Sequence, residues 1–518
     1  MFILSEKASH FSHNHMPEKN IKKKVVRKSM EEFIKSCSKS KSVKTSEMIV
    51  KLEDKFGQKM NYQAIANVQR NIDEDLFGEP AEDAEVMKNI LINLKNKLPD
   101  FLGEILKDEK TNKLRAMVFA SPRMKELAQN FMDLVVMDTT FGTNRFRMKS
   151  ITLCGKDNNN KTIIFSQGLI AQETKELFSW ILNETKNYFN VDPKFVLIDA
   201  DPALIGAVEL TYPTANLKVC GWHTENNFKN HLFGSKKSKH FFFNLLILLE
   251  LEKIEDDISK QNIYEIAINL PYILNEKEFN RRYELLLTNV VLSPSQLKYF
   301  QKMQDKKERW AFAFNKENSL GSHCTGMVEN INRLHKAHVG LKCGLSEYLY
   351  RTILFSTEFN NKNEISPEDL LQYNTYFSLM KGSSYVLLIS DHVTSFALKT
   401  IVINMMKSFS WKPFDDKDGV FKADKNHIKF IFTETDGLLL CSCNYQKVMK
   451  LPCEHILRIL TEKKKEESIL DYIGQRWRSE IQFQKEDEVL EELKILIEEE
   501  KLKKIPKIKF DQDEESKL

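Results

Sequence analysis

The sequence has no apolar run long enough to cross a membrane. The longest, Phe241–Leu251, is interrupted by Asn244 and Glu250, whereas a spanning helix needs about 20 apolar residues. The first ten residues, MFILSEKASH, also lack the apolar core of a secretion signal. These absences predict a nuclear or cytoplasmic protein with no membrane partner.

Cysteine is scarce, and charge of neither sign dominates. Eight cysteines in 518 residues, without a secretion signal, exclude a fold built on disulfides and indicate reduced thiols. Seventy-seven Lys and Arg against 73 Asp and Glu leave a net charge of +4, which is too small to indicate nucleic-acid binding by itself. The composition is that of a soluble globular protein, and the length predicts about two to four folded units.

Two short apolar runs each end on an aspartate. Leu134–Met137 precedes Asp138 and Phe195–Ile198 precedes Asp199, and such runs are typical of buried strands. Downstream, Glu329 stands in VENINRLHK, where apolar residues recur at helical spacing. Taken singly, these acids are ordinary turn or helix-cap residues. Taken together, they have the hard oxygen ligands that two divalent cations require.

The flanks of these acids resemble the Mutator-like (MULE) transposases and the nuclear proteins derived from them. The matching segments are MDTTFGTNRF, IDADPALIGAV, CGWH and GMVENINR, in that order. The resemblance covers roughly Leu134 to Trp477. It implies an α/β fold with a ribonuclease-H-like core of the retroviral integrase type at residues 131–345, carrying an all-helical insertion at about 230–316.

The same resemblance assigns a catalytic role to the acids. Asp138, Asp199 and Glu329 fall on the family's D-D-E triad, which implies two catalytic Mg²⁺ or Mn²⁺ ions. Two departures from the family are visible: Ile198 replaces a small hydroxyl residue, and Asp201 offers a competing carboxylate. Because Asp201 precedes a proline where a helix N-cap belongs, we assign the metal to Asp199 and the cap to Asp201.

Cys220-Gly-Trp-His223 follows the second acid. It supplies two ligands, whereas a structural zinc normally needs four, so we interpret it as lining the site. His223 would contact a DNA phosphate or orient a water, and Cys220 would lie in the core. Trp222 either stacks on a base or packs in the interior, and interior packing is the simpler explanation.

A second motif, CSCNYQKVMKLPCEH, contains two closely spaced ligand pairs. Cys441 and Cys443 are separated by nine residues from Cys453 and His455, and three thiolates with one imidazole form a tetrahedral zinc site. The spacing resembles the SWIM zinc finger, which implies a small C-terminal module at 426–465 with structural Zn²⁺ that contacts nucleic acid or protein.

The remaining segments are assigned from charge and periodicity. Residues 1–70 contain fifteen Lys and Arg against seven acids, which indicates either a phosphate-binding and nuclear-import segment or a solvated tail. Thr45–Phe56 and Asn61–Ile72 predict two helices, either a helix-turn-helix or a plain helical hairpin. The predicted units outside the catalytic core are a basic region at 1–75, a helical lead-in at 76–130, a helical and strand connector at 346–425 and a charged helical tail at 466–518.

These features together predict a DNA transposase of Mutator-like type in the nucleus. It would cut and transfer DNA phosphodiesters, binding double-stranded element ends and target DNA as a homo-oligomer. The alternative is a transposase-derived, DNA-binding transcriptional regulator that keeps the fold and the finger without strand transfer.

Overall fold

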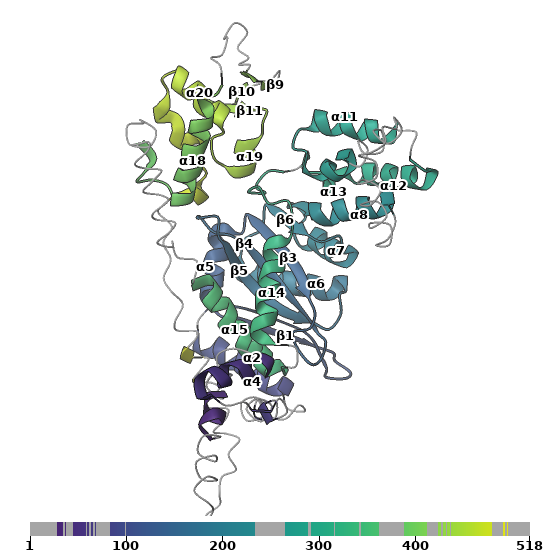
Figure 1. Cartoon of the computed structure of the whole chain (residues 1–518), viewed down its shortest axis with the longest axis vertical. Helices are drawn as coiled ribbons and strands as arrows, with labels where there is room; N and C mark the ends of the chain where they lie inside the picture. The colour runs from purple at the N-terminus through teal and green to yellow at the C-terminus, as the bar shows by residue number, and fades with distance from the viewer. Residues whose placement is uncertain are drawn as a thin grey trace, which may run out of the picture.

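A seven-stranded mixed sheet forms the centre of the computed structural model (Figure 1). Its strands are β1 Leu102–Lys107, β2 Leu114–Ala120, β3 Leu134–Thr140, β4 Lys149–Lys156, β5 Thr162–Ile170, β6 Phe195–Ile198 and β7 Asn216–Val219. Apart from gaps of one to three residues, the structure describes residues 83–361, except 234–264, then 388–411 and 437–478, with shorter stretches at 28–37, 45–68, 423–435 and 491–495.

The sheet changes from antiparallel to parallel at β3. The strand order is β1-β2-β5-β4-β3-β6-β7; pairs from β1 to β3 are antiparallel, and β6 and β7 run parallel to β3. All four residues of β6 are buried, as expected for a parallel strand covered on both faces. The carboxyl ends of β3, β6 and β7 therefore lie at one edge of the sheet.

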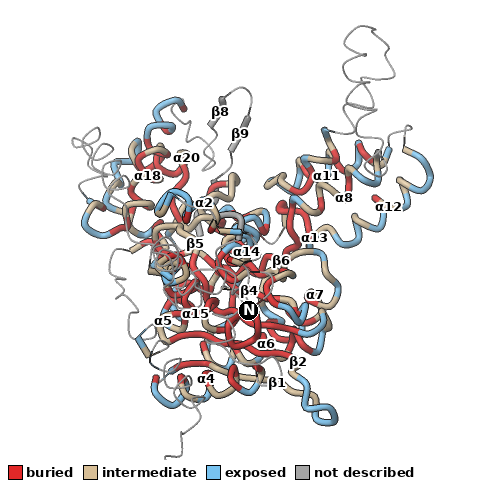
Figure 2. The backbone as a smooth tube through the Cα atoms, turned by 60° about the horizontal axis from the view of Figure 1, so that its bottom comes forward, coloured by how far each residue is buried: buried red, intermediate tan, exposed pale blue. Residues whose placement is uncertain are grey.

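Helices cover both faces of this sheet. Helices α4 Asp83–Lys97, α14 Gly326–Val339 and α15 Leu345–Asn361 pack on one face, and α5 Pro122–Phe131 and α6 Lys175–Phe189 pack on the other. Helix α7 Pro202–Thr211 lies beside α6. The buried residues run continuously between these layers (Figure 2). None of the helices in the described part of the chain is both long and apolar enough to cross a bilayer.

The structure of the lead-in at 76–130 differs from the sequence prediction. We expected it to be helical, but only α4 and α5 are helices, and β1 and β2 lie between them. A short apolar run such as Met117–Ala120 does not distinguish a buried helix from a strand, and pairing with β5 selects the strand. The turn between β1 and β2 is fixed locally, because the carboxylate of Asp108 accepts hydrogen bonds from the backbone and hydroxyl of Thr111.

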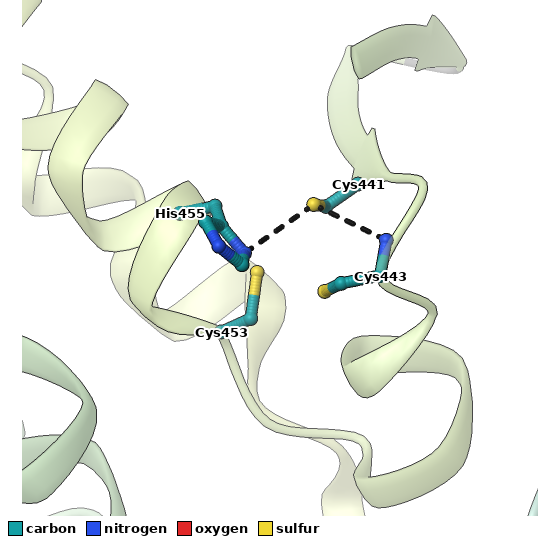
Figure 3. Close-up of side chains that lie close together, drawn as sticks. All are labelled: Cys441, Cys443, Cys453 and His455. Carbon is teal, nitrogen blue, oxygen red and sulfur yellow. Dashed lines mark hydrogen bonds between the residues drawn. The ribbon is translucent and has the colours of Figure 1, made fainter. Parts of the chain in front are cut away.

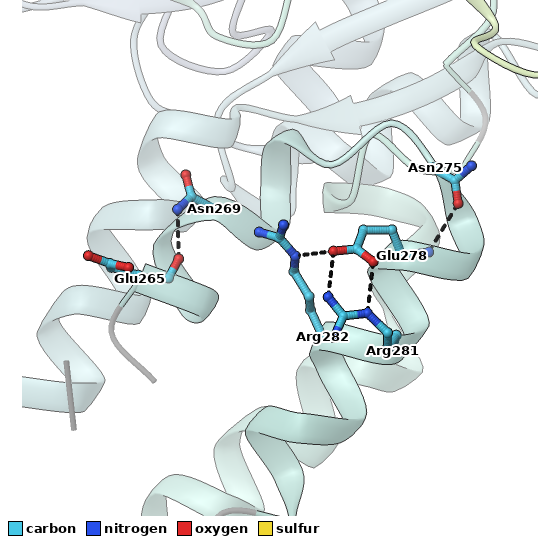
Figure 4. A network of polar contacts seen from close by, with 6 residues as sticks. All are labelled: Glu265, Asn269, Asn275, Glu278, Arg281 and Arg282. Carbon is cyan, nitrogen blue, oxygen red and sulfur yellow. Dashed lines mark hydrogen bonds and ion pairs between the residues drawn. The ribbon is translucent and has the colours of Figure 1, made fainter. Parts of the chain in front are cut away.

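The described residues between β7 and α14 contain helices and no strand. They comprise α8 Gly221–Phe233, η2 Leu270–Tyr272, α11 Glu276–Leu287, α12 Pro294–Asp305 and α13 Lys307–Trp310, packed around their own core of Phe228, Phe279 and Trp310. Asn275 caps α11, and Glu278 pairs with Arg281 and Arg282 (Figure 4).

A buried lysine joins this helical insertion to the sheet. The ammonium of Lys218 on β7 donates to the carbonyl oxygen of Ala311 at 3.0 Å and to that of Glu308. Burial lowers the pKa of Lys218 to about 7. The carbonyls satisfy the buried amine, so the insertion is fixed against the edge strand.

N-terminal of α4, part of the basic region is described. Helix α2 spans Thr45–Phe56, as predicted, and its Met48 and Leu52 share a small core with Met30, Ile34 and Ile65. The basic residues before Lys28 and most of the second predicted helix lie outside the described residues. The same holds for residues 479–490 and 496–518 of the charged tail.

Asp83 at the start of α4 clamps three segments together. Its carboxylate is 1% exposed and accepts hydrogen bonds from the backbone amides of Leu345 at 2.6 Å and Ser346 at 2.9 Å. It also pairs with Arg145, at 3.0 Å. The aspartate therefore caps α15 from a distant helix and holds the loop that follows β3.

We predict that Asp83→Ala destabilises the protein by about 2 to 4 kcal/mol, because it leaves two helix amides and a guanidinium without their carboxylate. Equilibrium denaturation would measure the loss. Glu85→Ala, on the exposed side of the same helix, is the control and should change the free energy of unfolding by less than about 0.5 kcal/mol. Equal losses of unfolding free energy in the two variants would contradict this structural role of Asp83.

Candidate metal and nucleic-acid site

The fold brings the three predicted acids to the same region of the sheet, near enough for Asp199 and Glu329 to affect the pKa of Asp138. Asp138 lies on β3, two residues before the strand ends, Asp199 directly follows β6, and Glu329 is in the first turn of α14. Burial, with a smaller contribution from the negative charges of Asp199 and Glu329, raises the pKa of Asp138 to about 6, although hydrogen bonds from Thr139 and Asn332 act in the opposite direction. Carboxylates must lie close together to affect one another in this way.

Asn332 orients the first acid and was missed by the sequence analysis. Its side-chain amide donates to Oδ2 of Asp138 at 3.1 Å, and its own oxygen accepts from the hydroxyl of Thr152 at 3.2 Å. Asn332 stands three residues after Glu329 and therefore on the same face of α14. That spacing was the available signal.

Glu329 is held by a residue of its own helix start. The hydroxyl of Thr325 donates to Oε1 of Glu329 at 2.8 Å, and the Thr325 carbonyl accepts from the Glu329 amide at 3.0 Å. The threonine was also missed from the sequence, because Thr325 is an ordinary residue before a helix. The third acid is thus oriented from the loop that leads into α14.

His223 lies against the second acid. Its Nδ1 is 3.1 Å from Oδ1 of Asp199. Hydrogen bonding to Cys220 raises the pKa of His223 to about 9, opposed by burial and assisted by the charges of Asp199 and Glu329. The imidazole is therefore cationic at neutral pH and reduces the negative charge of the acid site.

Cys220 and Trp222, on either side of Gly221, differ in exposure. Cys220 is fully buried, and its sulfur accepts from the Thr325 amide at 3.3 Å. Burial raises the pKa of the Cys220 thiol, but hydrogen bonds from His223 and Thr325 outweigh it and leave the pKa lowered. Trp222 is 50% exposed, so the interior packing that we considered simpler is wrong.

Asp201 takes the structural role that its position predicted. It is the N-cap of α7, and its Oδ1 accepts from the backbone amide of Leu204 at 2.8 Å. Asp199 is not a cap of α7, and its Oδ1 accepts from the amide of Ala200 at 2.7 Å. The prediction that Asp201 caps the helix is confirmed.

Cys441, Cys443, Cys453 and His455 come together in the C-terminal module (Figure 3). Cys441 ends β11 Leu438–Cys441, and Cys453 is the N-cap of α20 Glu454–Glu462. One ligand atom from each residue lies within 4.8 Å of all the others. A tetrahedral zinc with about 2.3 Å Zn–S bonds separates its sulfurs by about 3.8 Å, so the four residues fit zinc with small adjustments.

The thiols of this cluster affect one another's pKa through hydrogen bonds. Hydrogen bonding from Cys441, and then from Cys453, lowers the pKa of Cys443 well below its usual range. Since zinc binds thiolates, bound metal would replace the thiol protons.

A carboxylate stands behind the histidine ligand. Nδ1 of His455 faces the sulfur of Cys441 at 3.6 Å, and its Nε2 is 3.7 Å from Oε1 of Glu454. The indole of Trp411 donates to the same carboxylate oxygen at 3.1 Å. Such outer partners fix the orientation of a ligating imidazole.

Comparison with known proteins now places the site in a class. Residues 134–227 match the MULE transposase domain, so the chain carries a domain of the class that its motifs resemble. This span includes Asp138, Asp199 and Cys220-x-x-His223 and ends before Glu329. The C-terminal cluster is consistent with a SWIM-type zinc finger.

Two of the similar curated proteins are from Arabidopsis thaliana. The chain is 19% identical to Protein FAR1-RELATED SEQUENCE 6 over 78% of this chain and 57% of that protein. It is 22% identical to Protein FAR1-RELATED SEQUENCE 5 over 66% of this chain and 42% of that protein. The chain therefore spans about half the length of the curated relatives it matches.

We predict that the purified chain binds about one zinc ion, and that Cys453→Ser loses it. The serine keeps the N-cap of α20, so the loss would come from the missing thiolate and not from a broken helix. Elemental analysis of the protein after gel filtration measures the metal. Cys37→Ser, at a cysteine of the N-terminal region outside the four-residue cluster, is the control; full zinc content in Cys453→Ser would contradict the four-ligand site.

Asp138→Asn should stabilise the metal-free protein at pH 7 by on the order of 1 kcal/mol. The folded-state pKa of Asp138 is raised to about 6, so folding favours the protonated acid. The stability that protonated Asp138 gives to the folded state is fully present below about pH 4 and is lost as the pH rises through about 6. Equilibrium denaturation in chelator at pH 7 and at pH 4 measures the free energy of unfolding, with Asp201→Asn as the control. An equal increase in this free energy at both pH values would contradict the prediction.

Proposed function

We propose that the chain is a DNA transposase of the Mutator-like type with a ribonuclease-H-like catalytic core. The order β5-β4-β3-β6-β7 supports this fold, because three antiparallel strands are followed by two that run parallel to β3. In such a sheet the site lies at the carboxyl ends of the parallel strands, where Asp138 and Asp199 are found.

One observation supports the proposal: three carboxylates from distant parts of the chain lie near enough for two of them to affect the pKa of the third. Asp199 and Glu329 raise the pKa of Asp138 after burial has done so. Mutual repulsion destabilises a fold unless a cation relieves it. A site that keeps three such acids together is therefore suited to divalent cations.

Asp138, Asp199 and Glu329 would hold two Mg²⁺ or Mn²⁺ ions through their oxygens. When bound, the ions supply activation of the attacking oxygen and stabilisation of the leaving oxygen in an in-line phosphoryl displacement. Asn332 and Thr325 keep two of the acids oriented through their hydrogen bonds. His223, cationic beside Asp199, is placed to contact a DNA phosphate.

DNA contact would extend beyond the acids. Trp222, half exposed next to His223, offers an aromatic face to a base. The basic residues near the N-terminus and the zinc module are further candidates for binding double-stranded DNA at element ends and target. We also propose nuclear location and assembly into a homo-oligomer on DNA, as the resemblance implies.

The alternative function is a transposase-derived transcriptional regulator that binds DNA without cutting it. The observation in its favour is that the matched relatives are named as FAR1-related sequences. Both proposals use the same fold and zinc module. Only cleavage requires the three acids.

Asp199→Asn should abolish Mn²⁺-dependent cleavage of DNA carrying the element's own ends, while folding and DNA binding remain near normal. It removes one charged ligand and almost no volume. Asp201→Asn is the matched control and should keep activity, because asparagine caps a helix about as well as aspartate. A strand-cleavage assay with parallel binding measurements separates the two.

Each other outcome of this assay has a definite meaning. Activity in Asp199→Asn with loss in Asp201→Asn would show that the acids are misassigned. Cleavage by neither the wild-type protein nor Asp201→Asn, with DNA binding intact, would favour the regulator. Activity in all three proteins would remove Asp199 from the mechanism.

A further inference from the structure

Four successive backbone carbonyls in the zinc module accept hydrogen bonds from other segments of the chain. Helix α19 Tyr445–Met449 lies between the two ligand pairs, and the last carbonyls of a helix have no partner within it. Here four successive carbonyls find partners in other segments. Those of residues 447 to 450 accept, in order, from Asn318 N at 3.3 Å, Leu320 N at 3.2 Å, Trp477 Nε1 at 2.7 Å and Gly474 N at 2.9 Å.

Two of these donors belong to the loop at residues 316–325, which leads into α14 and which we term the approach loop. Leu320 is 1% exposed and has a φ of 48°, a left-handed conformation that is uncommon for leucine. Asn318 and Gly321 are also left-handed, at 65° and 69°. Such conformations persist when surrounding contacts hold them, and here the carbonyls of α19 are among those contacts.

Side chains close the same interface. A Cβ on Gly321 would lie 3.3 Å from the sulfur of Met449 at the end of α19. The ammonium of Lys156 on β4 donates to the Leu320 carbonyl at 3.2 Å. The approach loop is therefore held between the zinc module and the catalytic sheet.

The far end of the approach loop reaches the acid site. The carbonyl of His323 accepts from the amide of Gly221 at 2.8 Å. Thr325 then donates its amide to the sulfur of Cys220 and its hydroxyl to Glu329. Eight residues after Asn318 meets α19, the same backbone starts the helix that carries the third acid.

We propose that the zinc module positions the third acid, so that metal binding at Cys441, Cys443, Cys453 and His455 orders the approach loop and with it Glu329. The bound metal fixes the ends of the segment that contains α19, and α19 supplies the carbonyls that hold the loop. The module then has a structural role in the acid site besides any contact with DNA. This coupling stands whether or not the acids catalyse cleavage.

Coupling between two sites is reciprocal, which gives a direct test. Gly321→Ala adds a Cβ against Met449 at a left-handed position, and no atom of it touches a zinc ligand. We expect it to weaken zinc binding about fivefold or more, the lower end of typical coupling, in competition with a chromogenic chelator. Gly57→Ala is the matched control, since Gly57 has a similar φ of 63° with open space around it. Unchanged zinc affinity in Gly321→Ala would overturn the proposal.

Hydrogen exchange in the wild-type full chain supplies a second readout that needs no activity. Stripping zinc should speed exchange of the Leu320 and Thr325 amides, while the β1–β2 pair, for example Ile105 with Met117, keeps its protection. Faster exchange confined to residues 437–478 would show that the module does not hold the loop. Faster exchange that includes β1 and β2 would equally overturn the proposal, because the coupling is local.

Discussion

Burial of the Asp138 carboxylate near two other acids is the constraint on which the candidate acid site depends. Asp138, Asp199 and Glu329 come from a strand, the residue after a strand and a helix, and the pKa of Asp138 records the cost of burying it beside the other two. Without stiff support, a chain would relieve this cost by moving the acids apart. The parallel pairing of β3 with β6 and the packing of α14 on β3 provide that support.

The supporting contacts come mostly from segments far away in sequence. Asp83 ties α4 to α15 and, through Arg145, to the loop after β3. From the other end of the chain, Arg476 pairs with Asp133 at the start of β3 and donates to the carbonyl of Lys156 at 2.6 Å. Both are buried charges with several partners, the arrangement that makes burial of a charge tolerable. The central sheet is thus fixed by residues on both sides of it in the sequence.

The sequence was sufficient to predict the strands whose apolar runs are buried on both faces, and motif spacing was sufficient to identify the four residues that cluster as a possible zinc site. It was insufficient for β1 and β2, because their pairing with β5 is a long-range contact. The start of β4 at Lys149 also depends on a side-chain contact, because the Asn144 side chain bonds both the amide and the carbonyl of Met148 and holds the chain in a turn.

The polar residues that orient the acids show why such sites are only partly predictable. Asn332 and Thr325 disturb neither the helical period nor the composition of α14, so nothing local marks them; their roles arise from partners 194 residues away for Asn332 and at the helix start for Thr325. Asp201 differs because its partner is the third residue along the chain. Local chemistry was therefore predictable from local sequence. The positions of residues that act across the sheet follow from the fold, and the fold in turn is held by contacts such as those of Asp83, Arg476 and the approach loop.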